Sequence, residues 1–144
     1  MVDVVDKATR SRMMSGIRSK NTRPELTVRK SLHRAGFRYR LHVRSLPGKP
    51  DIVLPKYRTV IFVHGCFWHW HECHYFKLPA TRTGFWKKKL RANRQRDEMN
   101  AGQIKLMGWK VLVVHECDLR DTPVKTLLNL EKQVKAGGHF QQNK

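Results

Sequence analysis

Residues 64–73, His-Gly-Cys-Phe-Trp-His-Trp-His-Glu-Cys, constrain the fold more than any other segment of the chain. They gather thiols and imidazoles, the ligands that Zn²⁺ prefers, in one short loop. Cys117, the third and last cysteine, lies far downstream, so one ion bound by all three thiols would tie two distant segments together. Residue type and spacing predict a structural zinc site with the ligands Cys66, His71, Cys73 and Cys117, and His74 is an alternative histidine ligand. The competing interpretation is buried free cysteines beside surface histidines.

The charge of the chain predicts a polyanionic partner. Lysine and arginine number 30 against 11 acids, and the formal net charge is +19 over 144 residues. Such an excess favours nucleic acid and predicts salt-sensitive binding. The length predicts one domain over 1–144, and no apolar run is long enough to span a bilayer. The N-terminus does not resemble a secretory signal, so we expect a cytoplasmic protein, in which an odd cysteine count favours metal ligation over disulfides.

The order of the expected elements predicts an α/β fold with a mixed central sheet. A basic N-terminal arm covers residues 1–20, and a polar tail that we expect to be disordered covers 138–144. Between them the pattern predicts helices over 22–36, 83–107 and 122–136, and strands over 37–43, 51–54, 59–63 and 109–114. Pairing Leu54 with Thr59 in the hairpin would place Asp51 opposite Phe62, near His64.

That register gives Asp51 two interpretations. A lone aspartate after a proline is usually a turn or cap residue, but a carboxylate at a strand end can also hold Mg²⁺ against a phosphate. His64 and His69 are either solvated loop residues or an acid and a base for cleavage. Glu25 is explained well by a capping box with Thr22, and its carboxylate would touch a metal-bound water only if the helix begins beside Asp51.

Aromatic side chains accompany the basic segments. Phe67 and Trp68 lie among the expected metal ligands, and Trp86 precedes three successive lysines. Large aromatics are usually core residues, but beside so much positive charge they can also stack on bases or wedge between them. Met14 in the basic arm is either a minor packing residue or a groove wedge.

Taken together, the motifs resemble the very short patch repair (Vsr-type) endonucleases, from the basic N-terminus to about residue 120. The matching motifs are Pro50-Asp51, residues 62–69, residues 79–83, Phe85-Trp86, Asn93, Arg96-Asp97, Gly108-Trp109 and Glu116-Cys117. The resemblance implies a restriction-endonuclease-like mixed sheet flanked by helices. It implies a monomeric, Mg²⁺-dependent hydrolase that nicks double-stranded DNA 5′ to the thymine of a T:G mismatch, the product of 5-methylcytosine deamination. A DNA cytosine methyltransferase, a polymerase and a ligase would be its functional partners.

The resemblance also assigns roles to residues. It makes Asp51 and the backbone carbonyl of Val63 the Mg²⁺ ligands, His69 the general base, and His64 the support for the phosphate or leaving group. Glu25 would organise metal-bound water. The zinc ligands would be Cys66, His71, Cys73 and Cys117. DNA would be contacted by Phe67, Trp68, Trp86, Lys89, Asn93 and Met14.

Three positions depart from the family pattern: Val63 stands where threonine is usual, Trp70 interrupts a common run of histidines, and His115 replaces a common tryptophan. Other interpretations of the chain are a related zinc-containing nuclease without mismatch preference, a non-catalytic DNA-binding module, and a basic RNA-binding protein. Only the nuclease interpretations need Asp51.

Overall fold

The computed structural model describes residues 21–141, and their side chains up to residue 136, as an α/β fold. The basic arm, Met14 and residues 142–144 lie outside the described residues. Along the chain the elements are α2 (Arg23–Arg34), β1 (Arg40–Leu41), β2 (Ile52–Leu54), the 3₁₀ turn η1 (Pro55–Tyr57), β3 (Thr59–His64), α3 (Thr83–Leu106), β4 (Lys110–His115), α4 (Glu116–Asp121) and α5 (Pro123–Gln141). The predicted α/β class with a mixed central sheet flanked by helices is confirmed.

A mixed sheet in the order β1-β2-β3-β4 forms the centre of the fold. The first two pairs are antiparallel, and β3 runs parallel to β4. Leu54 pairs with Thr59, as the hairpin pattern predicts. Arg58, at the end of η1, takes a positive φ of 48° and turns the chain back into β3. The register brings Asp51 alongside the C-terminal end of β3, where the histidine-rich loop begins.

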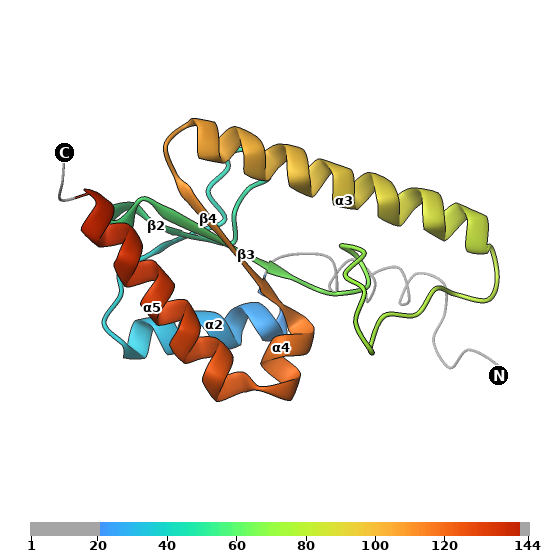
Figure 1. Cartoon of the computed structure of the whole chain (residues 1–144), viewed down its shortest axis with the longest axis horizontal. Coiled ribbons are helices and arrows are strands. Elements are labelled where there is room, and N and C mark those ends of the chain that lie inside the picture. The colour runs from blue at the N-terminus through green and yellow to red at the C-terminus, as the bar shows by residue number, and fades with distance from the viewer. Residues whose placement is uncertain (1–20, 142–144) are drawn as a thin grey trace.

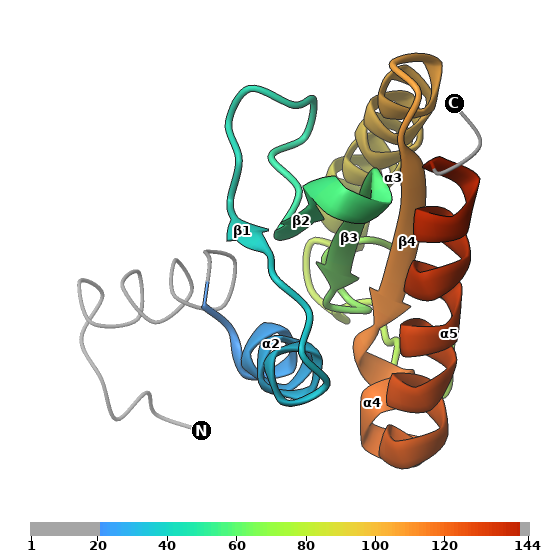
Figure 2. The same cartoon turned by 90° about the vertical axis from the view of Figure 1, so that its left-hand side faces the viewer.

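Helices cover both faces of this sheet (Figures 1 and 2). One face packs against α2, α4 and α5, and its core includes Leu32, Ile61 and Leu130. The other face packs against the C-terminal end of α3 through Ile104, which meets Val60. Alternating side chains of a strand point to opposite faces, so the apolar residues of β2 and residues 60–63 of β3 contribute to both cores.

Helix α3 extends well beyond the sheet. Its 24 residues correspond to a length of about 36 Å. Only Leu90 and Ile104 are buried along it, so most of its surface is not used for packing. Its N-terminal half lies over the loop that follows β3 (Figure 1). The helix therefore presents a largely basic surface next to the histidine-rich segment.

Several element boundaries differ from the sequence expectation. The strand expected over 37–43 is reduced to Arg40–Leu41, because the chain turns away at His42 with a positive φ of 49°. Thr83 does not cap α3: Arg82 takes that position, and the Thr83 hydroxyl donates to the carbonyls of Pro79 and Ala80.

The C-terminal region also differs. The short helix α4 was not predicted, because it follows β4 directly and no loop signal separates them. Helix α5 continues through Gly137 and Gly138 to Gln141, past the expected end near Ala136. Glycine lowers helix propensity by roughly 1 kcal/mol without removing a backbone hydrogen bond, so it need not end a helix. Within the described residues, no helix has the length and apolarity to cross a membrane.

Candidate active site and metal centre

One open cleft of about 1260 Å³ gathers the predicted catalytic residues. It lies where the start of α2, the end of β3 and the middle of α3 meet, and its lining includes Glu25, Asp51, His64 and His69. The cleft is also lined by Val63, Phe67, Trp68, Lys89 and Asn93, all of them predicted metal-binding or DNA-binding positions. Residues far apart in the sequence therefore meet in a single cleft, in which lysines and arginines lie beside acidic side chains.

Asp51 is fixed to the end of β3 by one oxygen. Its Oδ2 accepts a hydrogen bond of 2.7 Å from the backbone N–H of Val63. Burial raises the pKa of Asp51 from 3.8 to about 6, against the opposing effect of the Val63 hydrogen bond, and the nearby Glu25 adds to the rise. A carboxylate that is costly to ionise in this way favours a cation at its second oxygen.

His64 and His69 form a parallel stack, with ring centroids 3.7 Å apart and an interplanar angle of 3°. His69 Nδ1 lies 2.5 Å from Asp97 Oδ2 on α3. Because a carboxylate accepts, this contact places the proton of a neutral His69 on Nδ1 and leaves Nε2 as a proton acceptor. Burial and the neighbouring His69 lower the pKa of His64 to about 3, so that its imidazole is neutral near pH 7.

Glu25 is both a helix cap and a cleft residue. Its backbone N–H donates to the Thr22 hydroxyl over 3.4 Å, and its Oε1 accepts from the backbone N–H of Asn21. Its Oε2 lies 2.8 Å from His42 Nε2 and 3.3 Å from Arg29 Nη1. The side chain is 2% exposed. The capping interpretation of Glu25 is therefore compatible with a position beside Asp51.

Phe67, Trp68 and Trp86 form one aromatic cluster next to the cleft. Phe67 packs edge-on against Trp68, with ring centroids 5.0 Å apart, and Trp86 lies 5.6 Å and 6.0 Å from these two rings. All three side chains are partly exposed. The histidine-rich loop and α3 are joined here, because Asn93 Nδ2 also donates to the Trp68 carbonyl over 3.1 Å.

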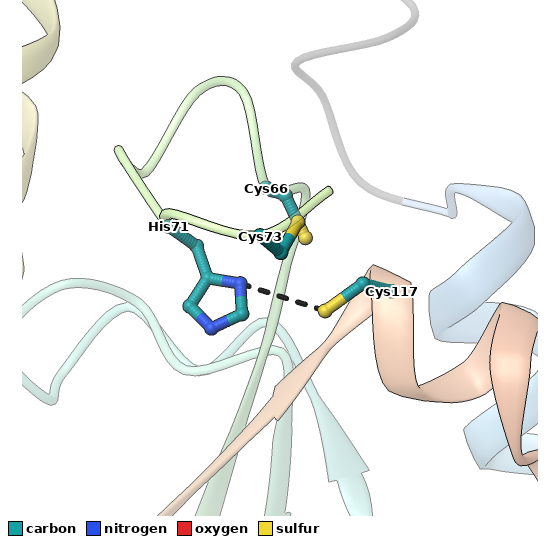
Figure 3. A group of neighbouring side chains, drawn as sticks. All are labelled: Cys66, His71, Cys73 and Cys117. Atoms are coloured by element: carbon teal, nitrogen blue, oxygen red, sulfur yellow. Dashed lines mark hydrogen bonds between the residues drawn. The ribbon is translucent and has the colours of Figure 1, made fainter. Parts of the chain in front are cut away.

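The four predicted zinc ligands converge where the histidine-rich loop meets the start of α4 (Figure 3). One ligand atom from each of Cys66, His71, Cys73 and Cys117 lies within 4.8 Å of the other three. His71 Nδ1 is 3.5 Å from Cys117 Sγ, as the dashed line in Figure 3 marks. Burial raises the pKa of Cys117 to about 12 and also raises that of Cys66, so both would lose their protons only to a bound cation.

His74, the alternative fourth ligand, does not belong to this group. Its Nε2 lies 3.2 Å from Asp121 Oδ2, and its side chain is largely exposed. A Cys₃His donor set of this compactness fits a tetrahedral metal such as Zn²⁺. The site would join the loop after β3 to the start of α4.

Comparison with known proteins identifies the family of the chain. Residues 2–75 match the family model described as DNA mismatch endonuclease Vsr. The chain is 48% identical over 120 residues to the DNA mismatch endonuclease Vsr of Escherichia coli strain K12, covering 83% of this chain and 77% of that protein. The chain belongs to the Vsr family of DNA mismatch endonucleases.

Other Vsr relatives carry a different description. The type II nicking enzyme V.XorIIP of Xanthomonas oryzae is 49% identical over 121 residues, covering 84% of this chain and 89% of that enzyme. V.NmeAIP of Neisseria meningitidis, also a type II nicking enzyme, is 43% identical over 137 residues and covers 94% and 98%. Vsr proteins are endonucleases and therefore hydrolases, so the prediction of an enzyme is confirmed.

The three departures from the usual Vsr pattern have distinct surroundings. Val63 uses its backbone N–H toward Asp51, which any residue except proline can do. Trp70 packs against Phe76 and donates from Nε1 to Glu72. His115 stacks on His71, with ring centroids 3.7 Å apart, and its Nδ1 is buried with no hydrogen-bond partner among the described residues. Only His115 therefore touches a residue of the metal centre.

Two cleft residues in this Vsr chain received no role from the sequence. Asp97 belongs to the Arg96-Asp97 motif, but nothing in its spacing from His69 indicates that the loop histidine contacts this residue of α3. His42 gave no signal at all, because a single histidine in a basic strand pattern resembles a surface residue. The missing information in both cases is how the elements pack.

Proposed function

We propose that this chain is an Mg²⁺-dependent endonuclease that nicks double-stranded DNA 5′ to the thymine of a T:G mismatch. Membership of the Vsr family supports the class of reaction. The observation that carries the proposal is the cleft in which Asp51 and the His64–His69 stack lie together, since cleavage needs a carboxylate and an imidazole at one phosphate. Arg44, Lys49 and Arg96 line the same cleft and would bind the DNA backbone.

Asp51 and the backbone carbonyl of Val63 would hold the Mg²⁺. In a strand, the N–H and C=O of one residue point to the same edge, and the Val63 N–H points to Asp51. Two oxygens of the type that Mg²⁺ prefers would therefore face one position. The cation supplies charge stabilisation at the phosphate and the leaving oxygen.

Proton transfer is assigned to the histidines. His69 is the base that accepts a proton from water at Nε2, because its Nδ1 is held by Asp97. Asp97 stabilises the imidazolium formed in that step. His64, neutral in its buried position, is the residue that can donate a hydrogen bond to the phosphate or leaving group. Glu25 orders water next to Asp51.

Mismatch recognition is assigned to the aromatic cluster. Phe67, Trp68 and Trp86 would enter the base stack, where a mispaired step costs less to open than a paired one. Lys89 and Asn93 would contact the mismatched bases. Met14 is proposed as a second wedge, although it lies outside the described residues. A Zn²⁺ bound by Cys66, His71, Cys73 and Cys117 would hold the histidine-rich loop, residues 64–73, rigid.

The wider context follows from this reaction. We propose a monomer with a restriction-endonuclease-like fold that acts in the bacterial cytoplasm on the nucleoid. A cytosine methyltransferase would create the 5-methylcytosine that deaminates to the mismatched thymine. A polymerase and a ligase would use the nicked strand.

A nicking assay tests the proposal. Duplexes with one labelled strand and a central T:G, T:A or C:G pair, with varied flanking bases, are incubated with Mg²⁺ or EDTA. We expect a nick 5′ to the thymine of T:G with Mg²⁺ alone. Asp51→Ala should abolish it, while Glu131→Ala on α5 should leave it unchanged. Cleavage that persists in Asp51→Ala would refute the assigned chemistry.

A nuclease without mismatch preference is the second candidate, because several relatives are described as type II nicking enzymes. It predicts equal cutting of the three duplexes. The Trp86→Ala variant adds a second criterion: stacking is worth about 1–3 kcal/mol per base, so a mismatch enzyme should lose roughly tenfold or more of its preference for T:G.

A further inference from the structure

Among the described residues, His42 is the one that hydrogen-bonds both to Glu25 and to Asp51. The register of β1 with β2 pairs Leu41 with Ile52, so that His42 stands opposite Asp51. Its backbone N–H donates to the Asp51 carbonyl over 3.1 Å. Its ring Nε2 lies 2.8 Å from Glu25 Oε2. His42 therefore fixes the backbone of Asp51 and the side chain of Glu25.

The backbone of His42 supports a specific role for this geometry. A positive φ of 49° is uncommon for a residue with a side chain and costs roughly 1–2 kcal/mol. This conformation ends β1 and lets the N–H face Asp51 while the ring turns to Glu25. Turn residues such as Arg58 share this conformation, so it is the pair of contacts made by His42, together with its φ, that indicates a positioning role.

We propose that His42 is a positioning residue: its ring holds the Glu25 carboxylate while its backbone N–H anchors the Asp51 main chain, so that the two residues keep a fixed separation beside the cation. The inference rests on the proposed function and adds a residue to it. His42 orients groups that bind the cation and its water, and does not itself touch the reacting atoms.

The alternative of a second cation held by Glu25, His42 and Asp51 is weaker, although their ligand atoms lie within 4.8 Å of one another. Arg29 Nη1 is 3.3 Å from the Glu25 oxygen that faces His42, and its charge repels a cation there. The other Glu25 oxygen already accepts from the Asn21 N–H. The carboxylate is therefore satisfied by donors, which favours positioning over ligation.

Three variants of the full chain separate the outcomes. His42→Ala removes the ring. His42→Gln keeps an N–H donor at a similar distance from the backbone and should restore function. His33→Ala changes an exposed histidine on α2 and is the matched control. Thermal unfolding of each variant checks that it is folded.

Two measurements are made: kcat and KM for nicking of a T:G duplex, and binding of Mn²⁺, as a paramagnetic substitute for Mg²⁺, to the DNA-free protein by electron paramagnetic resonance. For His42→Ala we expect roughly 10- to 100-fold losses in kcat and in Mn²⁺ affinity, with KM for DNA changed by no more than about twofold. His42→Gln should recover most of both losses.

Three results would overturn the inference. His42→Ala could leave both kcat and Mn²⁺ affinity unchanged. It could raise KM alone, which would indicate a DNA contact. It could remove one equivalent of Mn²⁺ while the remaining affinity stays the same, which would indicate a metal ligand. If the wild type does not nick the T:G duplex, the proposed function fails, and the Mn²⁺ measurement still decides whether His42 supports the cation site.

Discussion

Replacing Asp51 by asparagine should stabilise the metal-free protein while abolishing nicking. The substitution keeps the size of the side chain, and the amide oxygen can still accept the hydrogen bond from the Val63 N–H. What it removes is the charge, which burial and Glu25 make costly. In the proposed function the wild-type carboxylate is retained for the cation, so function and stability would oppose each other at this residue.

The size of the effect follows from the pKa of Asp51. Its rise from 3.8 to about 6 corresponds to about 3 kcal/mol of lost stability once the group is ionised in both states. Because the pKa in the folded protein is the higher one, this loss appears as the pH rises through 6 and shrinks below it. At pH 5 the advantage of asparagine should fall to about half of its value at pH 7.5.

Thermal unfolding in EDTA measures this effect. At pH 7.5 we expect a Tm for Asp51→Asn above that of the wild type by roughly 6–12 °C, and a smaller difference at pH 5. Mg²⁺ should raise the Tm of the wild type only. The reasoning is refuted if the asparagine variant is less stable than the wild type in EDTA, or if the difference grows as the pH falls.

Three further predictions concern neighbouring features. Burial lowers the pKa of His64 to about 3, so its ring should show no titration by NMR between pH 5 and 8, and a midpoint near 6.5 would contradict this. When the pH falls from 7.5 to 5, the unfolded wild type gains a proton on His64 and the folded protein does not, which lowers the free energy of unfolding. The His64→Gln variant has no such group, so its free energy of unfolding should fall by about 2 kcal/mol less. Cys73→Ser should release the bound zinc and lower the Tm, whereas Asp51→Asn should keep one zinc per chain. Elemental mass spectrometry measures the zinc content, and equal zinc in both variants would exclude the assigned ligands. Gly48→Ala should cost more stability than Gly36→Ala in urea unfolding. Both glycines have a positive φ, but a Cβ at Gly48 would lie 2.9 Å from Asn100 Nδ2, while a Cβ at Gly36 meets open space. Equal costs would mean that the Asn100 side chain moves away freely.

The parts of the fold that follow from local chemistry were predictable. Thr22 and Glu25 predict the start of α2, and Gly108, with a φ of 92°, follows the end of α3. The hairpin pairing of Leu54 with Thr59 follows from two apolar runs around a short turn. That pairing was enough to bring Asp51 to the end of β3, and hence to the histidine-rich loop.

The parts that depend on packing between elements were not predictable. The contact between His69 and Asp97 requires α3 to cross above the loop, and α3 carries too few buried residues for its sequence to show which face does so. His42 faces Glu25 only because β1 ends after Leu41. The sequence pattern favoured a longer strand, in which the direction of that ring would differ.

The two classes of residue also differ in what holds them in place. Three of the predicted zinc ligands and Asp51 lie in one loop or beside a strand end, where spacing along the chain limits their positions, while Cys117 lies in the first turn of α4. Helix α3 carries Trp86, Asn93 and Asp97, and it packs against the sheet near its C-terminal end. Their positions over the cleft depend on the histidine-rich loop, through the Asn93–Trp68 hydrogen bond and the ring contacts of Trp86. A metal that fixes this loop therefore also fixes the helix that completes the site, so loss of zinc should disturb His69 and the aromatic cluster together.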